Sequence, residues 1–145
     1  MPTPVPPHRA QLVLVDDDLE TREMYTAWLE HVGFHVLHAD NADTGFRYAV
    51  DRQPQVVITD HVLKIGSSGS ELCRRLKGDP RTTHIPTLLM TGAAERRTSE
   101  SAIEAGCAVV RLKPYLPDAM LADIDAIIRG DRIERFPSEH GPQRD

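Results

Sequence analysis

The sequence contains little cysteine and few aromatic residues. Two of its 145 residues are cysteines, Cys73 and Cys107, and 5% are Phe, Trp or Tyr. Two cysteines this far apart form neither a zinc-type pair nor the disulfide framework of a small secreted domain. We therefore expect both thiols to be reduced, as in cytoplasmic proteins, and to pack as small hydrophobic side chains without a chemical role.

The sequence also lacks an excess of positive charge and any long apolar run. Its 17 Lys and Arg residues and 22 Asp and Glu residues give a formal net charge of −5. Nucleic-acid phosphates repel such a surface, so direct binding to DNA or RNA is not expected. No apolar run approaches the roughly 20 residues that cross a membrane, so membrane insertion is not expected either.

The length fits one domain, because a domain usually has roughly 100 to 200 residues. Residues 1–10 are rich in proline and are predicted to be a flexible leader. Residues 11–130 are predicted to form the folded domain. Residues 131–145 are polar and are predicted to be a C-terminal tail without an output domain, so that any signal passes to another molecule.

After the leader, short apolar segments alternate with amphipathic ones, which predicts strands and helices in an α/β fold with a parallel sheet. The strands are expected at Leu12–Val15, Phe34–Ala39, Val56–Thr59, Thr87–Met90 and Val109–Leu112. The helices are expected at Leu19–Val32, Ala42–Arg52, Glu71–Lys77 and Ser99–Ala105, and from Pro117 to a stop at Gly130. Tyr25 and Trp28 have the spacing of core residues in the first helix.

The residues able to carry chemistry stand directly after the predicted strands. Asp16 and Asp17 follow the first strand, Asp60 the third, Thr91 the fourth and Lys113 the fifth. In a parallel sheet these ends lie along one edge, where open α/β folds bind their ligands. Several carboxylates cannot all stay ionised in one pocket without help, and Mg²⁺ prefers carboxylate oxygens together with a phosphate. The pattern therefore predicts a site for Mg²⁺ and a phosphoryl group.

Two other polar groups have simpler interpretations. Asp18 is predicted to cap the first helix rather than to bind a metal. His31, His35 and His38 are expected to be surface or partly buried residues, because Gly33 breaks the helix between the first two.

The motifs at the strand ends, taken in order, carry a family resemblance. They lie in the stretches LVLVDDD, VVITD, HIPTLLMTG and AGCAVVRLKPY. From about Leu12 to Gly130 the chain resembles the receiver domain of two-component response regulators, of the stand-alone single-domain type. The resemblance implies a flavodoxin-like three-layer α/β/α fold, with a five-stranded parallel sheet of order 2-1-3-4-5 and five helices. The receiver domain would then be residues 11–130.

The resemblance further implies that Asp60 accepts phosphate from a phosphohistidine, carried by a sensor histidine kinase or a histidine phosphotransfer protein. The chain would not be a conventional enzyme, although it would catalyse its own aspartyl phosphorylation. The signal is expected to pass to a downstream protein in the cytoplasm through the fourth helix, the fifth strand and the fifth helix. Both a monomer and a dimer are compatible with the sequence.

The other roles in the site also come from the resemblance. The expected Mg²⁺ ligands are three carboxylates and one backbone carbonyl, from Asp16, Asp17, Asp60 and Val62. Thr91 is expected to hydrogen-bond the transferred group, and Lys113 to neutralise its charge. A cis Lys113–Pro114 bond would aim the lysine into the pocket.

The sequence departs from the usual receiver pattern at several positions. Lys64 replaces the proline expected four residues after the acceptor, and Gly69 comes one residue later than usual, so the loop has gained a residue. Val110 stands where the family often has an aromatic ring, so the signal must leave by backbone shifts or another side chain. Val62 and Ala93 flank the path of an attacking water and cannot orient it, so slow self-dephosphorylation is expected.

Three other functions compete with this interpretation. A phosphatase of the haloacid dehalogenase type would use Asp16 and Asp18, but the chain is short and lacks the later acidic pair. A flavodoxin-like electron carrier would need a first loop that cradles phosphate, which aspartates repel. A phosphorylation-independent, receiver-like adaptor is the main alternative. The changes at Lys64 and Val110 favour it, whereas the retained set of charged residues argues against it.

Overall fold

A computed structural model describes residues 10–92 and 96–135 of the chain, and within them strands and helices alternate. The strands are β1 (Gln11–Val15), β2 (His35–Ala39), β3 (Val56–Asp60), β4 (Thr87–Thr91) and β5 (Val109–Leu112). The helices are α1 (Leu19–His31), α2 (Ala42–Arg52), α3 (Gly69–Gly78), α4 (Arg96–Ala105) and α5 (Pro117–Arg129). The predicted leader lies almost entirely outside the described residues.

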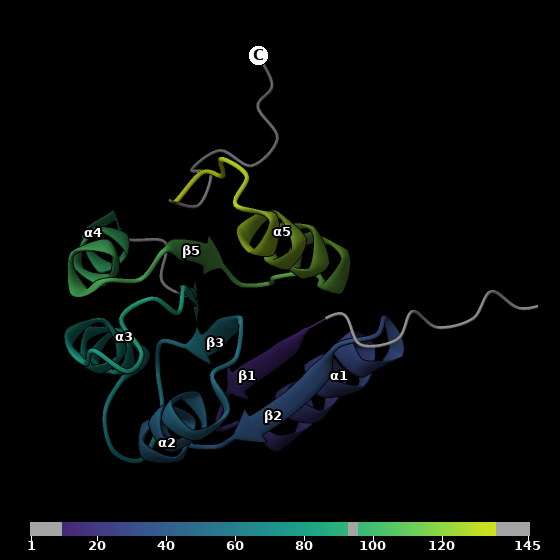
Figure 1. Ribbon diagram of the computed structural model, residues 1–145, viewed down its shortest axis with the longest axis horizontal. Coiled ribbons are helices and arrows are strands. Elements are labelled where there is room, and N and C mark those ends of the chain that lie inside the picture. The colour runs from purple at the N-terminus through teal and green to yellow at the C-terminus, as the bar shows by residue number, and fades with distance from the viewer. Residues whose placement is uncertain (1–9, 93–95, 136–145) are drawn as a thin grey trace, which may run out of the picture.

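The strands form one parallel sheet in the order β2-β1-β3-β4-β5. Figure 1 shows α1 and α5 on one side of this sheet and α2, α3 and α4 on the other. Parallel strands buried on both faces need apolar side chains throughout, and the central strands β3 and β4 are buried at every residue. The predicted flavodoxin-like, three-layer architecture is confirmed.

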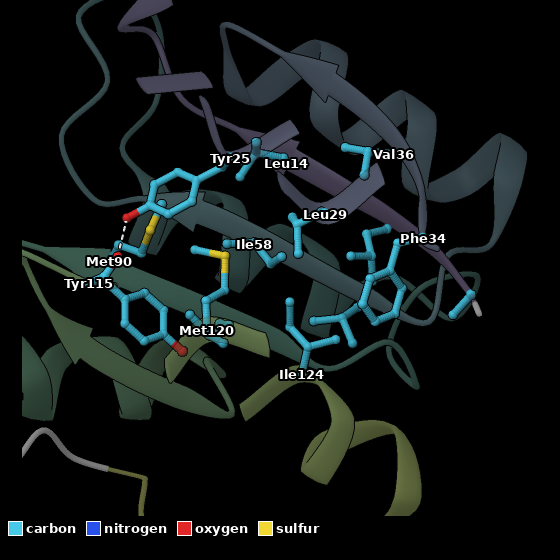
Figure 2. Close-up of a cluster of buried hydrophobic side chains, with 14 of the residues drawn as sticks. Leu14, Tyr25, Leu29, Phe34, Val36, Ile58, Met90, Tyr115, Met120 and Ile124 are labelled. Atoms are coloured by element: carbon cyan, nitrogen blue, oxygen red, sulfur yellow. Dashed lines mark hydrogen bonds between the residues drawn. The ribbon is translucent and has the colours of Figure 1, made fainter. Parts of the chain in front are cut away.

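The core under α1 and α5 is closed by a tyrosine and a tryptophan that bond to backbone carbonyls. Tyr25 is buried, and its hydroxyl donates to the carbonyl of Tyr115 at 2.5 Å (Figure 2). The indole Nε1 of the half-buried Trp28 donates to the carbonyl of Pro117 at 3.2 Å. These bonds satisfy the polar ends of large apolar side chains, so α1 is joined to the segment that begins α5. The prediction that Tyr25 and Trp28 belong to the core is confirmed.

Two helices begin earlier than the sequence predicted. α3 begins at Gly69 rather than Glu71, because the hydroxyl of Ser68 accepts a hydrogen bond from the backbone N–H of Glu71 at 3.1 Å and caps the helix. α4 begins at Arg96 rather than Ser99. The small residues before α3 have the composition of a loop, which hides the cap from a pattern analysis.

The expectation that the cysteines have no chemical role is wrong. Cys73 on α3 and Cys107 before β5 are both fully buried, as predicted, but they are joined by a disulfide bond with a Cα–Cα distance of 5.5 Å. The fold brings them together across 34 positions of sequence because α3 and the α4–β5 connection pack on the same face of the sheet. Nothing in the spacing alone reveals this contact.

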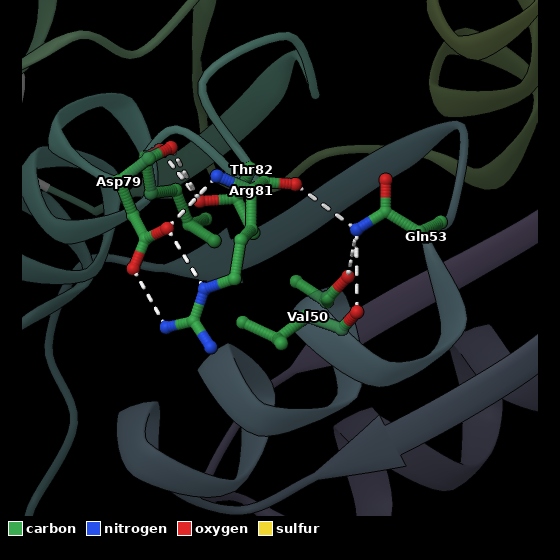
Figure 3. A network of polar contacts seen from close by, with 7 residues as sticks. Val50, Gln53, Asp79, Arg81 and Thr82 are labelled. Atoms are coloured by element: carbon green, nitrogen blue, oxygen red, sulfur yellow. Dashed lines mark hydrogen bonds and ion pairs between the residues drawn. The ribbon is translucent and has the colours of Figure 1, made fainter.

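A polar network fixes the edge of the sheet opposite the carboxyl ends of the strands. The carboxylate of Asp79 accepts bonds from the backbone N–H of Arg81 at 2.8 Å and from its guanidinium at 3.0 and 2.8 Å (Figure 3). These bonds lower the pKa of Asp79 to about 2. The side-chain amide of Gln53 donates to the carbonyl of Arg81 at 3.0 Å, so the end of α2 is tied to the α3–β4 connection. None of the described helices is both long and apolar enough to cross a membrane.

Candidate functional site

Three carboxylates converge at the carboxyl edge of the sheet. Asp16 and Asp17 follow β1, and Asp60 ends β3, the neighbour of β1 in the sheet. One oxygen from each carboxylate lies within 4.8 Å of the other two. Asp16 is fully buried and Asp60 is 7% exposed, so solvent screens their repulsion poorly. The prediction that these side chains meet is confirmed by the geometry.

The buried carboxylate of Asp16 is only partly satisfied by hydrogen bonds. Its Oδ1 accepts a bond from the backbone N–H of Asp18 at 2.9 Å. Its Oδ2 is buried and has no hydrogen-bond partner among the described residues. Burial raises the pKa of Asp16, and the nearby carboxylates of Asp60 and Asp17 raise it further. A hard divalent cation would satisfy the orphaned oxygen and favour its ionised form against both burial and the neighbouring charges, so the donor set fits Mg²⁺.

Lys113 supplies positive charge on the other side of the site. Its Nζ donates to Oδ2 of Asp60 at 3.0 Å, and its backbone N–H donates to the carbonyl of Thr91 at 2.8 Å. The Lys113–Pro114 peptide is cis, as predicted. One ammonium against three carboxylates formally leaves two negative charges uncompensated. One divalent cation would balance them. Thr91, buried at the end of β4, lies at the same edge.

The β3–α3 loop turns back over the aspartates. The backbone N–H of Lys64 donates to Oδ2 of Asp17 at 2.5 Å, so the lysine that replaces the usual proline contacts the site through its main chain. The backbone N–H of Gly69 donates to the carbonyl of His61 at 2.8 Å. Val62 is 66% exposed, and the role expected for its carbonyl stays a prediction.

Gly69 permits the close approach of α3 to the end of β3. A Cβ atom at this position would lie 2.2 Å from the carbonyl oxygen of Asp60, closer than non-bonded atoms can approach. The glycine therefore serves the site even though it comes one residue late in the sequence.

Two of the simpler interpretations are confirmed. The carboxylate of Asp18 accepts bonds from the backbone N–H and the hydroxyl of Thr21, at 2.9 and 2.6 Å, and caps α1. These bonds lower the pKa of Asp18. The side chains His31, His35 and His38 are exposed.

A second polar cluster next to the site escaped the sequence analysis. The hydroxyl of Tyr115 donates to Oδ2 of Asp123 at 2.5 Å, and Nε of Arg111 donates to the same oxygen at 2.8 Å. These residues join β5 to α5 just beyond Lys113. Burial and the bond to Asp123 raise the pKa of Tyr115. The eight-residue separation of Tyr115 and Asp123 spans a turn and a helix start, so no helical or strand spacing signals their contact.

Known proteins share both this fold and this sequence pattern. Residues 12–125 match the family model of the response regulator receiver domain. The phosphate regulon transcriptional regulatory protein PhoB of Pseudomonas aeruginosa is 35% identical over 118 residues, which are 81% of this chain and 51% of PhoB. Protein PilH of the same bacterium is 30% identical over 121 residues, which are 83% of this chain and 99% of PilH.

Solved structures agree. A two-component response regulator of the LuxR family from Aurantimonas has a TM-score of 0.77 and 27% identity, over 87% of this chain and 89% of that one. The CheY4 chemotaxis response regulator of Vibrio cholerae, at 20% identity, has a TM-score of 0.75 and supports the fold alone. The chain spans about half the length of PhoB and of the next curated relative it matches.

The close approach at Gly69 can be tested by adding a methyl group there. Gly69→Ala forces a methyl group against the carbonyl of Asp60, and overpacking of this kind lowers the free energy of unfolding by about 1–3 kcal/mol. Gly78→Ala in the last turn of α3 is the matched control, because its added methyl group meets no atom within 4 Å. Urea denaturation of both variants measures the difference. Equal stability of the two variants would contradict the packing argument.

Proposed function

Because the chain belongs to the response regulator receiver family, we propose that it is a phosphoacceptor of a two-component or phosphorelay system and that Asp60 is the acceptor. A carboxylate oxygen of Asp60 attacks the phosphorus of a phosphohistidine. The phosphorus–nitrogen bond breaks, and the imidazole leaves with its electron pair and takes up a proton. The product is an aspartyl phosphate, and the chain itself is not a conventional enzyme.

One observation carries this proposal, namely the position of Asp60 between two acidic neighbours and a lysine. Its Oδ2 is 3.0 Å from Nζ of Lys113, while Asp16 and Asp17 lie on the other side. Phosphoryl transfer needs little covalent help from the protein, and its main requirements are positioning and neutralisation of the charge on the equatorial oxygens. Lys113 meets part of the second requirement, and the hydroxyl of Thr91 is suited to hydrogen-bond the transferred group.

The metal ligands in this proposal are the three aspartates whose carboxylate oxygens converge, together with one backbone carbonyl. Asp16, Asp17 and Asp60 would hold Mg²⁺ through carboxylate oxygens, and Val62 through its backbone carbonyl. The bound ion would supply the remaining positive charge during transfer. The unpaired Oδ2 of Asp16 favours binding of the ion, since a buried and unpaired carboxylate oxygen is costly.

The partners follow from the reaction. The phosphodonor would be a sensor histidine kinase or a histidine phosphotransfer protein, and the chain would work in the cytoplasm, where such donors are made from ATP. The receiver would be residues 11–130, and its signal would pass to a downstream protein through α4, β5 and α5. The cluster of Arg111, Tyr115 and Asp123 lies on β5, α5 and the connection between them, so a shift at Lys113 could reach this surface directly.

The phosphorylation-independent adaptor is not favoured. An adaptor has no physical need for a buried aspartate with an unpaired oxygen beside two other carboxylates. Removing that charge would stabilise a protein that never binds a cation or a phosphoryl group there.

The acceptor is tested by intact mass after incubation with Mg²⁺ and acetyl phosphate. We expect one phosphoryl adduct on the wild-type chain and none on Asp60→Asn or in a metal-free sample, because both the acceptor oxygen and the cation are required. Asp51→Asn, on the exposed end of α2, is the control that removes a carboxylate elsewhere and should keep the adduct. An adduct that survives in Asp60→Asn would refute the assignment.

The lifetime of the adduct tests the role of Val62. A valine cannot orient an attacking water, so we expect the phosphoaspartate to decay slowly, and to decay faster in Val62→Asn. Following the decay of the adduct by mass after removal of acetyl phosphate gives both rates. A wild-type half-life of only seconds would overturn this expectation.

A further inference from the structure

The disulfide of Cys73 and Cys107 lies in a part of the molecule that the proposed phosphotransfer does not use. The two residues form an apolar cluster with Leu89, Ala102 and Val110, between the sheet and the helices α3 and α4. All five are fully buried. The bond thus ties α3 to the connection between α4 and β5 from inside the core.

Close packing of backbone and side chain holds the cysteines in place. Gly106, the residue before Cys107, has a φ of +114°, and a Cβ atom there would lie 2.8 Å from Cβ of Lys77. Lys77 is one helical turn after Cys73 on α3, so it lies on the same face of the helix. Only a glycine at position 106 therefore lets the α4–β5 connection approach α3 this closely, at Lys77 and, through the disulfide, at Cys73.

The bond encloses the segment that connects the site to α4. Between Cys73 and Cys107 lie β4, with Thr91 at its end, and α4. Val110, where receivers often have an aromatic ring, packs in the same cluster as the two sulfur atoms. A covalent bond at this point restricts any rearrangement in which α4 and the start of β5 move relative to α3.

A pocket lies against the residues on either side of Cys107, although neither cysteine lines it. It has a volume of about 490 Å³, and its lining includes Gly106 and Ala108, the residues on either side of Cys107, together with Lys77 and Ile103. The sulfur atoms themselves are buried, so a thiol reaches them only when the α4–β5 connection opens locally. Exchange at this bond therefore depends on the conformation of that connection.

We propose that Cys73 and Cys107 form a reversible redox site, and that its oxidation restrains the response to phosphorylation. The oxidant is a low-molecular-weight disulfide such as oxidised glutathione. One cysteine thiolate attacks it and releases a first glutathione thiolate, and the second cysteine then attacks the mixed disulfide and releases another. Two electrons pass to the oxidant, which is reduced to two thiols once protonated, and the protein gains one bond.

In the cytoplasm, where the proposed function places the chain, a disulfide bond is unusual. Disulfides are rare in cytoplasmic proteins and, where present, are usually transient and redox-sensing. The restraint on signalling rests on the proposed function, whereas formation of the bond does not. By linkage, if oxidation weakens the phosphorylated conformation by some factor, occupation of Asp60 must favour reduction by the same factor.

The test has two arms on the full-length chain. In the first, the protein is equilibrated with glutathione at a series of reduced-to-oxidised ratios, and free thiols are counted by alkylation and intact mass. In the second, the oxidised and reduced forms are titrated by calorimetry with beryllium fluoride in Mg²⁺, a reversible mimic of a phosphoryl group. Cys73→Ala and Cys107→Ala are measured in parallel, since neither can form the internal bond.

We expect complete and reversible conversion in the first arm, and in the second an affinity about fivefold or more lower for the oxidised form, within the range of ordinary allosteric coupling. The two variants should bind like the reduced wild type at every ratio. Thiols that never oxidise, a bond that no thiol ratio reduces, or equal affinity of the two forms would overturn the inference. Absence of binding by both forms would instead refute the proposed function and leave the first arm to decide the redox site.

Discussion

Mutual repulsion of three carboxylates is the constraint on which the rest of this molecule depends. Asp16, Asp17 and Asp60 present oxygens within 4.8 Å of one another in a largely buried corner. The raised pKa of Asp16 expresses the cost of that arrangement, because burial and like charges both disfavour its ionised form. A folded chain tolerates such a cost where a ligand relieves it, and the charge balance with Lys113 leaves room for one divalent cation.

The fold meets this constraint through register and close approach. Val15 pairs with Thr59 in the sheet, so the residues that follow them, Asp16 and Asp60, leave adjacent strands at the same level. Gly69 lets α3 begin directly against the carbonyl of Asp60. The backbone N–H of Lys64 then donates to Asp17, which offsets part of the negative charge from the loop side. Each of these devices is local, and together they build one site from distant segments.

The site could be predicted from the sequence because its residues directly follow the predicted parallel strands, whose carboxyl ends share one edge of the sheet. Once the apolar segments were located, the residues after them had to lie along one edge, and the structure places Asp60 and Lys113 in direct contact there. Contacts away from the strand ends could not be predicted in this way. The bond between Cys73 and Cys107 depends on how α3 and the α4–β5 connection pack on one face of the sheet, and the contact of Tyr115 with Asp123 depends on the turn before α5, neither of which periodicity encodes.

The central claim is tested most directly by the stability of Asp16→Asn with and without Mg²⁺. Asparagine keeps the acceptor for the N–H of Asp18 but removes the buried charge. In metal-free buffer we expect the variant to have a higher free energy of unfolding than the wild type. At Mg²⁺ about 100-fold above its Kd the wild type should gain about 2.7 kcal/mol and the variant much less, so the advantage of the variant shrinks or reverses. A variant that is less stable without metal, or equal stabilisation of both chains by Mg²⁺, would contradict the account.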